Sequence, residues 1–225
     1  MSQILHSKIL GEGPPLIILH GFLGMLDNWK TLGNQYAKAG FQVHLVDQRN
    51  HGKSFWSWEF DYDVLAEDLL QYVNHHHLPA ISLMGHSMGG KTAMQFACDH
   101  SGRVTKLIVA DIAPKFYPPH HHDILDALGR LDFNSIHSRG EADSVLAHSI
   151  SHQGIRQFLL KNLYWKEKDR LALRINLEVL SQKMEAIGAS IGATAIFEKP
   201  TLFLRGDRSE YIQEADEDEI KRHFP

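Results

Sequence analysis

One ten-residue segment, Ile81-Ser-Leu-Met-Gly-His-Ser-Met-Gly-Gly90, constrains the fold of this chain more than any other. Residues 81–84 are typical of a short buried strand, and residues 91–98 place apolar side chains on one helical face. Ser87 therefore lies on a turn between strand and helix, with Gly85 and Gly89 two positions away on either side. This pattern favours a nucleophile elbow, a strained and crowded turn that exposes a serine hydroxyl, over a glycine-rich loop that only ends a strand.

Length and composition favour a single cytoplasmic domain. The chain has 225 residues, of which 43% are hydrophobic, enough for one sizeable core. The net charge is −4 with interspersed signs, so we expect neither nucleic-acid binding nor a basic membrane-binding patch. No apolar stretch is long enough for a signal peptide or a membrane span, and the single cysteine, Cys98, fits a reducing compartment. We therefore expect one domain over residues 1–225 and leave the oligomeric state open.

The order of the expected elements predicts an α/β fold. Short runs rich in Val, Ile and Leu predict strands at Leu16–His20, Gln42–Asp47, Ile81–Gly85, Lys106–Ala110 and Thr201–Arg205. Helical patterns lie between them at Asn28–Lys38, Tyr62–Asn74 and Ser87–His100. This alternation predicts a mostly parallel sheet with helices on both faces, and residues 3–10 are expected to add one or two short antiparallel strands.

The alternation breaks in the long segment between Asp111 and Thr201. Helices are expected there at Asp123–Leu131, Glu141–His148, His152–Asn162 and Asn176–Ile187. Because long insertions in compact domains are usually functional, we interpret residues 115–198 as a helical lid inserted after the sixth strand. An extension that only adds core is the alternative. Five apolar residues would either line a pocket or belong to that core: Phe158, Leu159, Leu163, Tyr164 and Trp165.

Two backbone N–H groups are candidates for an oxyanion hole, which acyl transfer by a serine requires. The first long strand is followed by Gly21, which lets the chain turn so that the N–H of Phe22 points toward the developing oxyanion. Met88 follows Ser87 at a helix N-terminus and would supply the second donor. We interpret His20 as a residue that packs against or orients this loop rather than as a base.

Two aspartates compete for the role of the orienting acid. Asp111 ends an expected strand, at the carboxyl edge where sites form in open α/β sheets. Asp207 follows the strand that begins at Thr201, but the usual acid position there, three residues after Gly206, holds Ser209. We favour Asp111 because triads are defined by geometry rather than by sequence order. The structural alternative for Asp111 is an N-cap of the following segment.

The segment from Asp47 to Ser54 predicts a tight structural loop. Gly52 supplies a free backbone angle, and Arg49 is expected to pair with Asp47. We interpret this loop, including His51, as scaffolding.

Two histidine runs stand out among the sixteen histidines, His75–His77 and His120–His122. Contiguous histidines on a helix cannot all face one ion, because ligands on one helical face recur at three or four positions. The first run is expected to form a solvated turn and the second to begin a helical region. We therefore predict no metal site.

Three segments resemble the α/β-hydrolase family and, within it, the small YbfF-type esterases and their mitochondrial relatives: Asp47–Ser54, Gly85–Lys91 and Asp111–Pro114. The resemblance extends over almost the whole chain. It implies the α/β-hydrolase fold and hydrolysis of acyl esters or thioesters with short to medium acyl chains, acyl-CoA among the candidates. It also implies an acid on the strand after the nucleophile helix, in agreement with Asp111, and neither a metal nor an organic cofactor.

The resemblance further implies a catalytic histidine in a loop after the last strand. The sequence ends at Pro225, in what is expected to be the helix after the Thr201 strand. We therefore expect a strand, a loop and a closing helix of roughly 25–30 residues outside this sequence. The histidines at His20, His86, His120–His122 and His223 are not expected to replace that base, because a base must reach the serine hydroxyl.

Two other functions stay open. A carbon–carbon hydrolase or lyase of the same fold would use the same serine geometry. A non-catalytic binding protein would keep the pocket without the base. Hydrolysis of esters or thioesters through an acyl-enzyme on Ser87 is the prediction that we carry forward.

Overall fold

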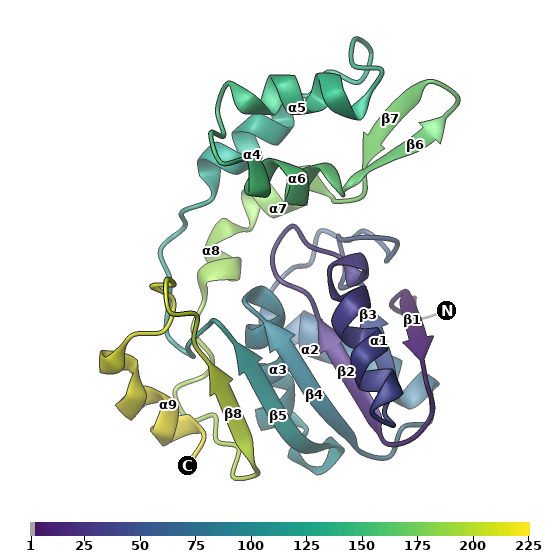
Figure 1. Ribbon diagram of the computed structural model, residues 1–225. Helices are drawn as coiled ribbons and strands as arrows, with labels where there is room; N and C mark the ends of the chain where they lie inside the picture. Colours follow the sequence, from purple (N-terminus) through teal and green to yellow (C-terminus); the bar gives the residue numbers. More distant parts are fainter. Residues whose placement is uncertain (1–2) are drawn as a thin grey trace.

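The computed structural model describes residues 3–225, which form a six-stranded sheet flanked by helices (Figure 1). Its strands are β1 (Ser7–Leu10), β2 (Pro15–Leu19), β3 (Gln42–Val46), β4 (Ile81–His86), β5 (Val104–Ala110) and β8 (Thr201–Leu204). They lie in the order β1-β3-β2-β4-β5-β8, and only β1 pairs antiparallel with its neighbour. The predicted mostly parallel sheet is confirmed.

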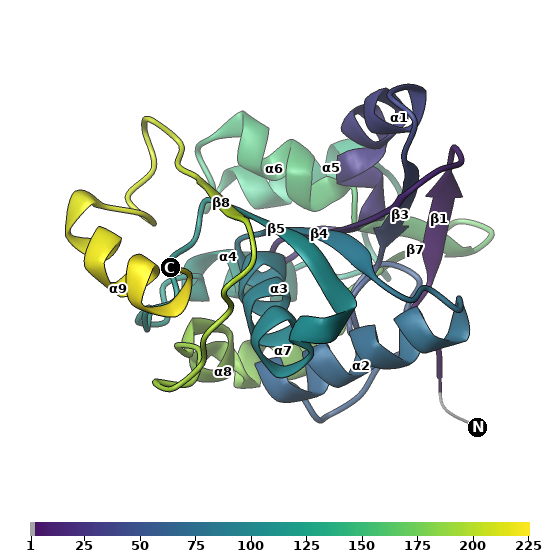
Figure 2. The ribbon, with the colours of Figure 1, turned by 90° about the horizontal axis from the view of Figure 1, so that it is seen from below.

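Helices cover both faces of this sheet. A short 3-10 helix, η1 (Leu26–Trp29), leads into α1 (Lys30–Lys38), while α2 (Tyr62–His75) and α3 (Met88–Asp99) follow β3 and β4. Figure 2 shows α1 on one side of the sheet and α2 and α3 on the other. The central strands β2 and β4 are buried along most of their length, as parallel strands covered on both faces should be.

The insertion, residues 115–198, forms its own layer over the carboxyl ends of the parallel strands (Figure 1). Its elements are α4 (His122–Gly129), α5 (Arg139–Ala147), α6 (Gln153–Leu160), β6 (Leu163–Glu167), β7 (Arg170–Leu173), α7 (Leu177–Gln182) and α8 (Met184–Gly188). One cluster of buried apolar side chains joins this layer to Phe22 in the loop after β2 and to Met88 at the start of α3. The insertion therefore packs against the loops that carry the candidate site.

Two predictions about the insertion were wrong. The antiparallel β6–β7 hairpin was not expected; its chain reversal uses Asp169 at a φ of 66°, a left-handed conformation that Asp tolerates better than most residues. The insertion also follows the fifth strand rather than the sixth, because the start of the described chain contributes only one strand, β1.

The last strand, β8, is covered on one face only. After it come the 3-10 helix η3 (Glu214–Asp216) and α9 (Glu217–His223), and Phe224 packs against Phe203 of β8 with ring centroids 5.3 Å apart. On the opposite face Leu202 and Leu204 are 52% and 43% exposed. A groove of about 340 Å³ runs beside Leu202, between β8 and α1. Within residues 3–225, no helix is both long and apolar enough to cross a membrane.

Candidate active site

Ser87 occupies a strained turn between β4 and α3. Its φ of 51° and ψ of −120° lie outside the regions that side-chain-bearing residues favour, and its N–H donates to the carbonyl oxygen of Ala110 at 3.0 Å. Such outliers persist only where the surrounding structure holds them, and they cluster at functional sites. This geometry is that of the nucleophile elbow predicted from the sequence.

The two flanking glycines leave room for this turn. A Cβ atom on Gly85 would lie 2.1 Å from the carbonyl oxygen of Gly89, and one on Gly89 would lie 2.5 Å from the carbonyl oxygen of His20. Both obstacles are backbone atoms, which cannot move aside. The predicted reason for these glycines, crowding of the turn, is confirmed.

The two candidate oxyanion donors lie beside Ser87. Among the hydrogen bonds of residues 3–225, neither the N–H of Phe22 nor that of Met88 has an acceptor, as expected for the first turn of a helix in the case of Met88. The loop differs from the prediction in one respect. Leu23, with a φ of 57°, makes the left-handed turn, whereas Gly21 is required because a Cβ there would lie 2.7 Å from Nδ1 of His86.

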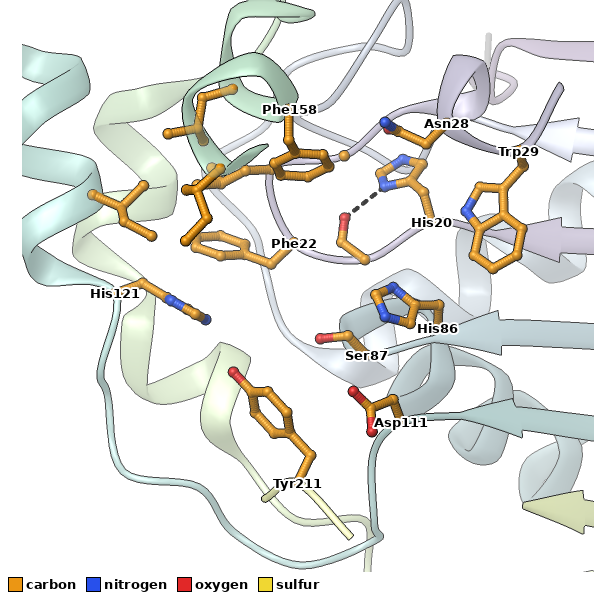
Figure 3. Close-up of a pocket in the computed structure, with 16 residues that line it drawn as sticks. His20, Phe22, Asn28, Trp29, His86, Ser87, Asp111, His121, Phe158 and Tyr211 are labelled. Atoms are coloured by element: carbon orange, nitrogen blue, oxygen red, sulfur yellow. Dashed lines mark hydrogen bonds between the residues drawn. The ribbon is translucent and has the colours of Figure 1, made fainter. Parts of the chain in front are cut away.

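His20 belongs to the scaffold of this loop. Its Nδ1–H donates to the carbonyl oxygen of Gly21 at 2.9 Å (Figure 3), and its Nε2 accepts from the backbone N–H of Gln48 at 3.0 Å. Gln48 in turn accepts from the hydroxyl of Thr92 on α3. Because both ring nitrogens of His20 are used and burial lowers its pKa to about 4, it orients the loop as the sequence indicated.

The Asp47–Ser54 loop is scaffolding, but its ion pair was predicted wrongly. Arg49 pairs with Asp68 of α2, Nε to Oδ2 at 2.5 Å, and not with Asp47. The carboxylate of Asp47 instead accepts from the backbone N–H groups of Leu26 and Lys53. Asp47 therefore ties the loop to η1, while Arg49 ties it to α2.

Asp111 lies at the carboxyl end of β5, beside Ser87 (Figure 3). Its backbone φ is 57°, its N–H donates to the carbonyl oxygen of Leu204 at 2.8 Å, and its Oδ1 accepts from the N–H of Gly206 at 3.3 Å. Asp111 and Ser87 line the same cavity, whereas Asp207 is exposed and does not line it. The geometry therefore brings the favoured acid, and not its competitor, to the serine.

The cavity above Ser87 has a volume of about 520 Å³ and mostly apolar walls. Its apolar residues include Trp29 of η1 and, from the loop after β2 and from α4 and α6 of the insertion, Phe22, Leu23, Ile124, Ile155, Phe158 and Leu159. Of the five insertion residues considered from the sequence, Phe158 and Leu159 line the cavity. Leu163 is buried in the core, the ring of Tyr164 lies under the guanidinium of Arg174, and Trp165 is 54% exposed.

Within residues 3–225, no histidine forms a hydrogen bond with the Ser87 hydroxyl. His86 and His121 line the cavity; the ring of His121 stacks on Phe22, with centroids 5.4 Å apart. His223 is buried elsewhere and bonds to the carbonyl oxygen of Ala195. In this part of the chain no cluster of three or more His, Cys, Asp or Glu side chains is arranged to hold a metal ion.

His51 supports the loop after β2 in its neutral form. Its Nδ1–H donates to the carbonyl oxygen of Arg49, its Nε2 accepts from the N–H of Leu23, and burial lowers its pKa to about 3. Between about pH 3 and pH 6.5, His51 therefore binds a proton in the unfolded chain but not in the folded chain, so its contribution to stability is lost as the pH falls through that window.

The expected result is an acid-sensitive fold. Near pH 5, His51→Gln should reduce the slope of unfolding free energy against pH by about 1.4 kcal/mol per pH unit. Urea titrations between pH 4 and pH 8 would measure both slopes. Equal slopes in the two proteins would show that His51 is not held neutral in the folded state.

Comparisons with known proteins agree with this geometry. The model of the alpha/beta hydrolase fold family matches residues 14–135. The chain is 35% identical to the zebrafish sn-1-specific diacylglycerol lipase ABHD11, covering 96% of this chain and 70% of the relative, and 31% identical to Escherichia coli esterase YbfF, covering 94% and 81%. A solved structure of a marine microorganism esterase superposes with a TM-score of 0.96 at 40% identity, covering 100% of this chain and 88% of that one.

The strand order, the strained serine turn after β4 and these similarities lead to one assignment. The predicted fold and the predicted resemblance to small esterases are both confirmed. This chain is a member of the α/β-hydrolase family.

Proposed function

We propose that this protein is a cytoplasmic serine hydrolase that cleaves acyl esters and acyl thioesters with short to medium acyl chains, through an acyl-enzyme on Ser87. One observation carries the proposal: the strained Ser87 faces a largely apolar cavity that Asp111 and Phe22 also border, and the N–H groups of Phe22 and Met88 have no acceptor among the hydrogen bonds of residues 3–225. The esterase and lipase names of the relatives support the ester-cleaving part. The 225 residues are proposed to belong to a single domain, with the insertion as its lid.

In the first step, a general base takes the proton from Oγ of Ser87 as Oγ attacks the acyl carbonyl carbon. The resulting oxyanion is stabilised by the N–H groups of Phe22 and Met88, the latter at the N-terminus of α3, where the helix dipole favours negative charge. Collapse of this intermediate expels the alcohol or thiol, which takes the proton from the base. Water then attacks the acyl-enzyme in the same way and releases the acid.

The general base is proposed to be a histidine outside residues 1–225, because no histidine of residues 3–225 bonds to the Ser87 hydroxyl. The relatives are longer: the chain spans 70% of the zebrafish lipase and 81% of the E. coli esterase. The apolar groove beside Leu202 offers a place where a further helix packs, as the predicted closing helix would. A histidine delivered from there to the carboxylate of Asp111 would be held in the tautomer that accepts the proton of Ser87.

Butyrate esters and butyryl-CoA provide the direct test. The full-length protein is expected to hydrolyse p-nitrophenyl butyrate and butyryl-CoA with sustained turnover. Hydrolysis of the ester alone would restrict the proposal to esters. Absence of both activities in folded protein would favour a binding role instead.

The apolar wall of the cavity is proposed to determine which acyl-chain lengths the enzyme accepts. Ile155 of α6 borders the cavity and is partly exposed, so a tryptophan there fits without disrupting the core. Ile155→Trp should lower kcat/KM for p-nitrophenyl octanoate about ten-fold relative to acetate, because losing space for one or two methylenes costs about 1–3 kcal/mol. Ile196→Trp, at an exposed apolar position that does not line the cavity, is the matched control. A parallel loss for both esters would refute a chain-length role.

A further inference from the structure

Lys91 is a buried cation on the nucleophile helix that the proposed reaction does not use. It lies one turn after Ser87 in α3 and is only 1% exposed. Lysine is almost never fully buried unless its ammonium has partners. Burial lowers the pKa of Lys91 to about 7, while the charge of Glu219 raises it and that of Lys115 lowers it. Because burying the Lys91 ammonium group costs free energy, its position in the fold requires a structural explanation.

The partners of Lys91 are carbonyl oxygens and aromatic rings. Its Nζ donates to the carbonyl oxygens of Lys115 and Ala189, each at 2.5 Å. It also faces the rings of Tyr117 and Tyr62, at 5.1 Å and 5.9 Å from their centroids, a favourable place for a cation. No carboxylate of residues 3–225 lies within 4.0 Å of it.

The two carbonyls belong to the two chain segments that join the insertion to the sheet. The first connector, residues 112–121, leads from β5 to α4, and the second connector, residues 188–200, begins at the last residue of α8 and leads to β8. Residues 114–117 of the first connector lie beside residues 188–191 of the second. The N–H of Tyr117 donates to the carbonyl oxygen of Gly188 at 2.8 Å, and that of Ile191 donates to the carbonyl oxygen of Pro114 at 3.0 Å.

The connectors also border the candidate site. A second, smaller cavity beside Ser87 is lined by Met88 of the nucleophile helix, by Tyr117 of the first connector and by Gly188 of the second. A shift of either connector would therefore change the shape of the space next to the serine and would move α4 and α6, which form the apolar wall of the main cavity.

We propose that Lys91 is a positioning residue that fastens both connectors to the nucleophile helix and thereby sets the position of the insertion over Ser87. One ammonium group bonds to the entry and to the exit of the insertion, and it extends from the helix that begins at the nucleophile. The purpose of this fastening rests on the proposed esterase function. The fastening itself does not, so it is tested without substrate.

Hydrogen exchange of the whole protein, followed by mass spectrometry, tests the proposal. Lys91→Met keeps most of the side-chain volume but removes the N–H donors. The amides of Tyr117 and Ile191 are expected to exchange about ten-fold faster in this variant, because hydrogen bonds from charged groups typically contribute about 1.5–3 kcal/mol. Peptides from β4 and β5 should exchange at the wild-type rate. Lys115→Met, which breaks the neighbouring ion pair to Asp216 but leaves the Lys115 carbonyl in place, is the control and should resemble wild type at Ile191.

Two results would overturn the proposal. One is wild-type exchange of both connector amides in folded Lys91→Met. The other is equal acceleration in the connectors and in β4 and β5, which would mean a general loss of stability. If Lys91→Met does not fold, Lys91→Gln replaces it; its side chain is one bond shorter and its uncharged amide makes weaker hydrogen bonds, so at least one connector amide should exchange faster while the sheet does not.

Discussion

Replacing Ser87 by alanine is expected to abolish hydrolysis of p-nitrophenyl butyrate, lowering kcat by about 10⁶-fold in the protein that includes its general base. The hydroxyl of Ser87 is the only group in the proposed mechanism that forms a covalent bond with the substrate. The methyl group of alanine fits the same turn, since it keeps the Cβ atom and removes only Oγ. Initial rates at saturating ester, corrected for spontaneous hydrolysis measured without enzyme, would measure the effect.

Ser181→Ala provides the matched control, because this serine is exposed on α7 and bonds only to the carbonyl oxygen of Leu177. It should retain the wild-type kcat. A Ser87→Ala protein with more than a few per cent of the wild-type rate and an unchanged thermal unfolding curve would mean that another group attacks the carbonyl.

Asp111→Asn should have the second-largest effect, a loss of about 10⁴-fold in kcat. The amide is nearly isosteric, but it cannot hold a histidine in the tautomer that accepts the serine proton or stabilise the imidazolium that forms. Asp111 borders the cavity with Ser87 and is tied to the loop after β8 through the N–H of Gly206. Rates at pH 8, compared with wild type, would measure the loss.

Asp207→Asn separates the two candidate acids. Asp207 is exposed and does not line the cavity, so this variant should lose less than two-fold in kcat. The reverse order, with Asp207→Asn inactive and Asp111→Asn active, would assign the triad acid to Asp207 and leave Asp111 a structural role.

The elbow was predictable because local sequence and local structure agree there. Backbone atoms crowd Gly85 and Gly89, so a residue with a Cβ atom does not fit at either position. The apolar strand that precedes the turn fixes where the turn begins. The parallel sheet was predictable for a similar reason, since buried strands require continuous apolar runs. Asp111 is a candidate acid in the sequence because it stands at the end of such a strand.

Contacts between distant residues were not predictable in this way. The sequence places Arg49 two residues from Asp47, yet its partner is Asp68, nineteen residues away on α2. The carboxylate of Asp47 instead accepts hydrogen bonds from backbone N–H groups of Leu26 and Lys53, and these contacts exist only in the folded loop. The two residues whose carbonyl oxygens bond to Lys91 lie 24 and 98 residues further along the chain. Because every residue has a backbone carbonyl, residue type does not indicate which carbonyls serve as acceptors.

The insertion shows a different limit. Tyr164 and Trp165 are large and apolar enough to suggest a pocket wall, but they lie on a hairpin whose reversal depends on a single left-handed Asp169. The apolar positions of α6 are visible from the sequence, whereas which of them face the cavity depends on how the insertion sits over the sheet.

The acyl-enzyme itself gives the most direct test of the proposed mechanism. The full-length protein would be mixed with p-nitrophenyl butyrate, quenched in acid within milliseconds and digested for mass spectrometry. If the acyl-enzyme forms on Ser87, a butyryl group is expected on the peptide that contains Gly85, Ser87 and Gly89. This group should disappear as the substrate is consumed. Sustained turnover with no acyl group on Ser87 at any time would contradict the proposed mechanism.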